Sequence, residues 1–162
     1  MIKKIILWIL VISWMTVIFA FSAQEATTSK KTSSSFTTAV VRFFDTDNSL
    51  TKQQIEDIVE NMTVIVRKGA HFTAYAFLGL LLALLLGQYN IFGLKQLLFS
   101  VFIAFLYACS DEFHQTFVKG RSGQLRDVGI DTAGALCGVL FIIAITVLIH
   151  KRRDLNGLYK KI

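Results

Sequence analysis

Long apolar runs, almost free of charge, recur four times along this chain of 162 residues. A helix needs roughly 20 such residues to cross the hydrocarbon core of a membrane, and lipid leaves the backbone of an open strand without partners. The third run, residues 97–110, reaches that length only if its helix continues through residues 111–117. The pattern therefore predicts an all-α, polytopic four-helix transmembrane bundle in a single domain over 1–162. The predicted spans are 5–22, 69–87, 95–117 and 127–150.

An outer loop over residues 23–68 separates the first two predicted spans. Its first part, residues 27–35, is polar and low in complexity, which is typical of a mobile segment. Thr51 and Gln54 have the spacing of a capping box, in which each side chain bonds the backbone of the other residue. The apolar residues that follow repeat at helical spacing and predict an amphipathic helix at the outer membrane interface. These residues are Ile55, Ile58, Val59, Met62, Ile65 and Val66.

Composition agrees with a chain whose surface faces lipid. Hydrophobic residues make up 54% of it, whereas about 45–50% is usual in soluble domains. Charged residues make up 17%, against about 25% in soluble domains. Cys109 and Cys137 both lie in apolar stretches, so a disulfide framework is not expected.

The formal net charge of +6 could indicate a nucleic-acid partner, but its distribution points to a membrane instead. Compact clusters of Lys and Arg flank the first and last spans, and cytoplasmic segments of membrane proteins carry an excess of these residues. We therefore expect a multi-pass protein of the cell membrane with both termini in the cytoplasm and no nucleic-acid partner. The basic residues expected on the cytoplasmic side are Lys3, Lys4, Lys95, Lys151, Arg152, Arg153, Lys160 and Lys161.

Residues 1–23 also have the features of a cleaved signal peptide, namely a basic start, an apolar core and small residues at Ala20 and Ser22. The apolar core is longer than the roughly 7–15 residues that are typical of such peptides. This length favours a first span that is retained over one that is removed.

Polar groups gather in three segments at the outer ends of the predicted spans. In the first segment, Lys68, His71 and Tyr75 share one face of the helix that enters the second span. Arg67 precedes them, and a basic residue at an interface commonly extends its charge toward water. His71 lies within the apolar part of the helix, so we expect a carboxylate as its partner.

The second segment continues the third span and contains Asp111, Glu112, His114 and Gln115. Two carboxylates and an imidazole so close together could bind a divalent metal, transfer protons or hold a polar head group. The candidate metal ligands are Asp111, Glu112 and His114. A hydrogen-bonded helix end that closes the bundle would explain the same residues without any chemistry.

The third segment runs from Arg121 through Arg126 and Asp127 to Asp131 in the fourth span. Gly134 and Gly138 follow on the same stripe as Asp127 and Asp131, and small residues at this spacing allow close helix packing. The stripe is therefore expected to face protein, with Asp131 inside the bundle. A buried aspartate needs a partner, and the candidates are Arg121, Arg126, Lys68 and His71.

At these three segments the chain resembles the VanZ-like family of bacterial integral membrane proteins. The matching stretches are RKGAHFTAY at 67–75, YACSDEFHQTFVKGRSGQLRDVGIDTAG at 107–134 and IFAFSAQ at 18–24. Many members have an acidic residue where this chain has Ala74, so a mechanism that needs a carboxylate there is not expected here. The family is named after a protein linked to teicoplanin-type glycopeptide resistance. The resemblance therefore implies a cell-envelope role that concerns lipid-linked wall precursors.

Three hypotheses follow for function. The first is an outward-facing polar pocket that binds an anionic lipid or lipid-linked wall precursor, with ligand contacts from Lys68, Tyr75, Gln115, Arg121, Arg126, Asp127 and Asp131. The second is a hydrolase or transferase that acts on a lipid-linked phosphate group, with His71, Asp111, Glu112 and His114 as catalytic residues and a divalent metal as a candidate cofactor. The third is a scaffold that docks a partner membrane protein through Gly134 and Gly138.

Overall fold

The computed structural model describes residues 1–47 and 49–159 of the chain, with side chains described up to Arg152. Within those residues it is all helical, as predicted, and four of its helices are long and apolar enough to cross a membrane. The fifth, α2, is polar and joins the first two spans. The helices are α1 (Ile2–Ser22), α2 (Ala26–Phe44), α3 (Lys52–Gly87), α4 (Gly93–Gln115) and α5 (Leu125–Tyr159).

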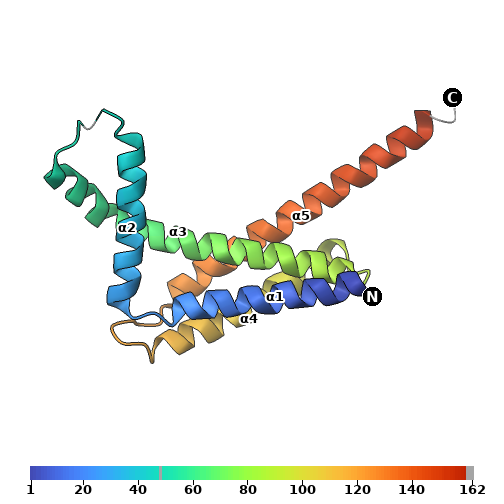
Figure 1. Ribbon diagram of the computed structural model, residues 1–162. Coiled ribbons are helices and arrows are strands. Elements are labelled where there is room, and N and C mark those ends of the chain that lie inside the picture. The colour runs from blue at the N-terminus through green and yellow to red at the C-terminus, as the bar shows by residue number, and fades with distance from the viewer. Residues whose placement is uncertain (48, 160–162) are drawn as a thin grey trace.

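The four spanning helices alternate in direction, as short connections between neighbouring spans require (Figure 1). The N-terminus and the turn between α3 and α4 lie at one end of the bundle, and α2 runs across the other end. Helix α5 crosses α3, and its C-terminal half extends away from the other helices toward the end that holds the N-terminus. The N-terminus and the described end of α5 therefore lie toward the same side of the molecule, as an even number of spans demands.

Close packing of α5 against α3 rests on glycines. A Cβ atom added at Gly134 would lie 2.2 Å from the carbonyl oxygen of Phe72, and one at Gly138 would lie 1.8 Å from that of Ala76. Gly79 of α3 makes the reciprocal approach to Ala135. The predicted glycine stripe thus faces protein, but the protein it faces is α3 of the same chain. The scaffold hypothesis assigned this stripe to a partner membrane protein, but in the structure the stripe packs against α3 and is covered by it.

Polar side chains join α1, α3 and α4 by hydrogen bonds to backbone carbonyls. The Trp14 indole donates to the carbonyl of Ala74 over 2.8 Å. The Gln96 amide donates to the carbonyl of Ala83 over 2.8 Å. The Tyr107 hydroxyl donates to the carbonyl of Met15 over 2.5 Å. Such bonds hold the helix register, because a buried donor without a partner is costly in an apolar surrounding.

The prediction of a mobile segment at residues 27–35 is wrong, because these residues belong to α2. Hydroxyl side chains in α2 bond carbonyls one turn back, as Thr37 does to Ser33 over 2.8 Å. Ser29 and Thr37 are buried, and α2 packs against α3. Polar composition therefore did not preclude a helix here, since a face of small residues can lie close to a neighbouring helix.

The predicted capping box at Thr51 and Gln54 is confirmed as the start of α3. The amphipathic segment over residues 55–66 is helical, as expected, and is continuous with the second span rather than a separate element. Its place at the membrane interface stays a prediction. The predicted continuation of the third span through Asp111 and Glu112 is also confirmed, since α4 ends at Gln115. Lys160 and Lys161, expected in the cytoplasmic cluster, lie outside the described residues.

Candidate functional site

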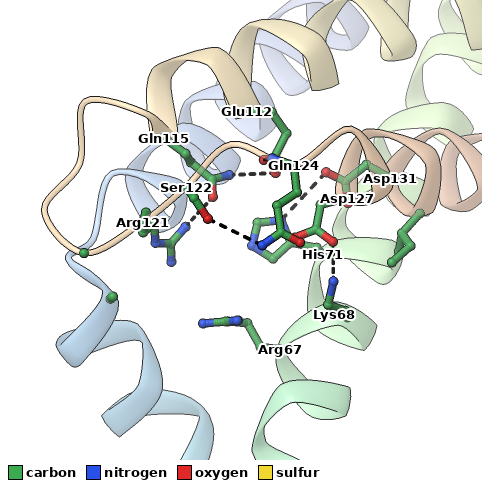
Figure 2. Close-up of a pocket in the computed structure, with 13 residues that line it drawn as sticks. Arg67, Lys68, His71, Glu112, Gln115, Arg121, Ser122, Gln124, Asp127 and Asp131 are labelled. Carbon is green, nitrogen blue, oxygen red and sulfur yellow. Dashed lines mark hydrogen bonds and ion pairs between the residues drawn. The ribbon is translucent and has the colours of Figure 1, made fainter.

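A cavity of about 110 Å³ opens at the end of the bundle where α2 begins (Figure 2). Helix α3 supplies one wall, the start of α5 a second, and the end of α4 with the loop that follows it closes the third. All three polar segments singled out in the sequence thus meet at one place. The lining residues are Ala26, Arg67, Lys68, His71, Glu112, Gln115, Gly120, Arg121, Ser122, Gln124, Asp127, Ile130 and Asp131.

The loop after α4 is held in place by Glu112. One carboxylate oxygen of Glu112 accepts from the backbone N–H of Gln124 over 2.9 Å. The other accepts from the amide of Gln115 over 3.1 Å. Gly123 lies so close to α4 that an added Cβ would meet the carbonyl oxygen of Glu112 at 2.5 Å. Glu112, predicted as a catalytic or metal-binding residue, therefore has both oxygens engaged, one by the loop and the other by Gln115 of its own helix.

Two ionisable side chains, His71 and Asp131, lie at the cavity floor, and a third, Asp111, is buried next to them without lining the cavity. Asp131 is fully buried (0% exposed) and lies against His71, with 3.9 Å between the carboxylate and the imidazole Nδ1. Asp111 is buried beside them, and its Oδ2 accepts from the Ser22 hydroxyl over 2.8 Å and from the Gln115 amide over 3.2 Å. One ligand atom from each of His71, Asp111 and Asp131 lies within 4.8 Å of the others. The expected carboxylate partner of His71 is thus Asp131.

This cluster differs from the metal set predicted from sequence, which was Asp111, Glu112 and His114. The imidazole of His114 packs on the ring of Phe19, with 4.5 Å between their centroids, and does not line the cavity. Helix periodicity placed His114 near Asp111, but the crossing of α1 over α4 covers it. His71 from α3 and Asp131 from α5 take its place, and only tertiary packing brings them there.

The cavity mouth is rich in cations. Lys68 forms an ion pair with Asp127, which neutralises both. Arg121 donates from Nη1 to the Gln115 side-chain oxygen over 3.1 Å, and its Nε is buried without a partner. Among the described residues neither Arg121 nor Arg67 forms an ion pair with a carboxylate. Burial, followed by the nearby charge of Arg67, lowers the pKa of the Arg121 guanidinium.

The order of motifs along this chain matches a known family. A model of the VanZ/LLP1 family covers residues 7–148, from the first turns of α1 to well inside α5. The chain belongs to the VanZ/LLP1 family. No curated protein and no solved structure matches it significantly. The family match includes every residue of the cavity, and the four apolar helices make this VanZ/LLP1 chain a multi-pass membrane protein.

Two ligand candidates predicted from sequence lie outside the cavity of this VanZ/LLP1 protein. Arg126 is exposed and does not line it. Tyr75 is fully buried (0% exposed), one turn deeper in α3 than His71. Its hydroxyl has no hydrogen-bond partner in the described part of the chain. Tyr75 therefore lies beneath the floor and not among the lining residues.

Four polar residues of the site were not predicted as ligand contacts. Arg67 was attributed to the membrane interface, and Ser122 and Gln124 belong to a loop whose path the sequence does not define. Ser22 had been noted only as a small residue near the end of the first span, although it lies within the matching stretch at 18–24. Its bond to Asp111 joins α1 to the site. The position of a hydroxyl side chain at the end of an apolar span was the feature of the sequence that could have indicated a role for Ser22.

Charge in this VanZ/LLP1 site is therefore divided by depth. The guanidinium groups of Arg67 and Arg121 stand at the mouth, and Asp131, whose oxygens have no hydrogen-bond partner among the described residues, lies at the floor (Figure 2). Such a site can bind an anionic group at its mouth, since guanidinium groups form strong charge-assisted hydrogen bonds with phosphate. Its floor can accept protons or hold a cation.

Proposed function

We propose that this VanZ/LLP1 protein binds the phosphate-bearing head group of an anionic lipid or lipid-linked wall precursor in the cavity at the end of its membrane bundle. The observation that carries the proposal is the pair of guanidinium groups, Arg67 and Arg121, which line one cavity without a carboxylate partner among the described residues. Two like charges held close together are unfavourable unless an anion joins them. A phosphate between them would satisfy both.

The third basic residue that lines the cavity, Lys68, is not available to a ligand, which leaves the two arginines for this role. Lys68 is already neutralised by Asp127, so the arginines are the donors that remain for a ligand. Arginine presents a planar set of donors that matches phosphate oxygens, and partial burial strengthens each contact. The cavity is small, which suits a head group while the acyl or prenyl chains stay in the surrounding lipid. Its position at the end of the bundle supports a head group as the ligand, because spanning helices end near the head-group region of a bilayer.

The expected orientation of the protein in the membrane decides which side of the cell the cavity faces. With both termini in the cytoplasm, as the terminal Lys and Arg clusters favour, the cavity opens toward the cell exterior. Lipid-linked wall precursors are exposed on that face. Binding there would change the access of glycopeptide antibiotics to their target, which fits the family's link to teicoplanin resistance.

Nanodiscs offer a direct test of head-group binding. The full chain would be placed in phosphatidylcholine discs, and binding of a short-chain polyprenyl phosphate or of phosphatidylglycerol would be titrated. We expect Arg67→Ala and Arg121→Ala each to weaken binding about tenfold or more, because a hydrogen bond to a charged group contributes about 1.5–3 kcal/mol. Arg126→Ala is the matched control, since Arg126 is exposed and outside the cavity.

Equal effects of Arg126→Ala and Arg121→Ala would contradict the proposal, because they would indicate general attraction of anionic lipid to a basic surface. Absence of saturable binding by the unmodified chain would contradict it as well. Tighter binding of the polyprenyl phosphate than of phosphatidylglycerol would identify a wall precursor as the ligand, and the reverse would identify a bulk lipid.

A second candidate function is hydrolysis or transfer of the lipid-linked phosphate group. The observation in its favour is the pair of buried carboxylates, Asp111 and Asp131, below the proposed phosphate position, with oxygens that have no partner among the described residues. A carboxylate in that position can act as a general base toward water. Release of inorganic phosphate from a polyprenyl diphosphate in the same discs would separate catalysis from binding alone.

A further inference from the structure

We infer that His71, Asp111 and Asp131 form a binding site for one divalent transition-metal ion at the floor of the cavity. The three residues come from α3, α4 and α5 and offer one imidazole nitrogen and two carboxylate oxygens within 4.8 Å of one another. This inference does not rest on lipid binding, since it concerns the floor of the cavity and not the arginines at its mouth.

The donor set suits a metal ion. Imidazole and carboxylate are the common protein ligands of zinc and manganese, at about 2.0–2.2 Å from the ion. Ligands of a tetrahedral ion at that distance lie roughly 3.4 Å apart. The 3.9 Å between His71 Nδ1 and the Asp131 carboxylate is close to this separation. Small side-chain rotations would complete the site.

Unsatisfied oxygens provide the second and independent observation. Both carboxylate oxygens of Asp131 and one of Asp111 are buried and have no hydrogen-bond partner among the described residues. Asp131 is 0% exposed and Asp111 is 2% exposed. Two buried carboxylates so close together repel each other and have lost their hydration, which costs several kcal/mol per ion. A bound divalent cation would remove both penalties.

Within the described residues, no cationic side chain donates a hydrogen bond to either of these carboxylates. Lys68 is held by Asp127, and Arg121 donates to Gln115. His71 is the nearest cationic group, but at 3.9 Å it does not form a hydrogen bond with Asp131. The described residues that surround the floor thus offer no hydrogen-bond donor to the free oxygens of Asp111 and Asp131.

The surrounding groups have the character of a second coordination shell. Ser22 and Gln115 both donate to the same oxygen of Asp111, which fixes the carboxylate and leaves its other oxygen free. Hydrogen bonds of this kind orient ligands before the metal binds. The Tyr75 hydroxyl, one turn further along α3 than His71, is also buried without a partner among the described residues. It could bond a metal-bound water.

Three protein ligands leave at least one coordination position open, and the cavity lies above it. Structural metal sites are closed by four protein ligands, whereas sites that bind substrates keep a position free. The imidazole favours Zn²⁺ or Mn²⁺ over Mg²⁺ and Ca²⁺, which prefer sites built only of oxygen. A phosphate at the cavity mouth would be within reach of an ion held at this floor.

Metal content of the purified chain tests the inference. The full chain in nanodiscs would be stripped with a chelator and then titrated with Mn²⁺ and with Zn²⁺, with the bound metal measured by mass spectrometry and Mn²⁺ also by electron paramagnetic resonance. We expect one ion per chain. His71→Ala and Asp131→Asn should each weaken binding by roughly tenfold or more, since loss even of an outer-shell group typically weakens a metal site about 10–100-fold.

His114→Ala is the matched control, because His114 is a half-buried histidine of the same bundle that packs on Phe19. It should bind metal like the unmodified chain. Asp111→Asn provides a second ligand variant should Asp131→Asn fail to fold. Failure of the folded, unmodified chain to bind either ion stoichiometrically would overturn the inference, as would unchanged binding in His71→Ala. Shared protonation of the two carboxylates would then explain their burial.

Discussion

At the residue scale, Glu112 and Asp111 show how adjacent carboxylates in one helix take different roles. Both oxygens of Glu112 accept hydrogen bonds from the loop and from Gln115. Asp111 is bonded at one oxygen only, by Ser22 and Gln115, and its other oxygen is free. Position along the helix decides this, because Glu112 points toward the loop that follows α4 and Asp111 toward α1 and α3. The first residue is structural, and the second keeps a free acceptor.

Substitution of Glu112 tests that division of roles. Glu112→Ala removes the partly buried hydrogen bond from the Gln124 N–H to the carboxylate, and a typical hydrogen bond contributes about 0.5–1.5 kcal/mol to stability. We expect a lower unfolding temperature in detergent and weaker anion binding, since Arg121 lies on the released loop. Glu56→Ala is the control, because Glu56 forms only an exposed pair with Lys52 (side chain 59% exposed). Equal unfolding temperatures for the two variants would argue against the anchoring role of Glu112.

At the element scale, the crossing of α3 and α5 places His71 opposite Asp131. The crossing brings backbone against backbone, and glycine allows this because it has no Cβ. Gly134 and Gly138 lie one and two turns beyond Asp131. Their contacts with Phe72 and Ala76 therefore fix the register of α5 on α3, and with it the position of Asp131 relative to His71. A shift of one helix along the other would separate the imidazole from the carboxylate.

Two glycines of α5 provide a matched comparison of this packing. Gly138→Ala would bring a Cβ to 1.8 Å from the carbonyl oxygen of Ala76, whereas a Cβ at Gly129 would meet nothing within 4 Å. We expect Gly138→Ala to destabilise the protein by about 1–3 kcal/mol through overpacking. Gly129→Ala should be neutral or stabilising by about 0.5–1 kcal/mol, because alanine favours a helix. Thermal unfolding in one detergent measures both, and a stable Gly138→Ala protein would count against the close crossing.

At the scale of the whole molecule, four spanning helices place the termini on one side and the cavity on the other (Figure 1). The turn between α3 and α4 lies with the N-terminus, where the Trp8 indole donates to the Tyr89 hydroxyl over 3.1 Å. Lys4 stands 4.2 Å from the centre of the Tyr89 ring. The two ends of the bundle thus differ in chemistry, with aromatic and basic groups at one and the ionic cavity at the other.

Reporter fusions test which end faces the cytoplasm. Green fluorescent protein fused to the C-terminus should be fluorescent and alkaline phosphatase fused there should be inactive, because basic clusters are retained in the cytoplasm. Alkaline phosphatase inserted after residue 46, in the connection between α2 and α3, should be active. The opposite pattern would put the cavity in the cytoplasm and remove the proposed access to wall precursors on the outer face.

The sequence alone determined the number of helical spans, their approximate ends and the capping box at Thr51, because apolar length and local hydrogen bonding act over neighbouring residues. It also indicated that three polar segments would meet and that Asp131 would be buried. It did not predict α2, since the contact that stabilises this polar helix is with α3, distant in sequence.

Tertiary structure decided which residues share the site. Helix periodicity grouped His114 with Asp111, but packing covered His114 with Phe19 and brought His71 and Asp131 to Asp111 instead. The packing of the helices likewise left Arg126 exposed and placed Arg67 in the cavity. The reason is geometric. The face of a helix follows from local sequence, whereas the partner of that face depends on crossings set by contacts between distant segments, such as Gly134 on Phe72 and Gly138 on Ala76.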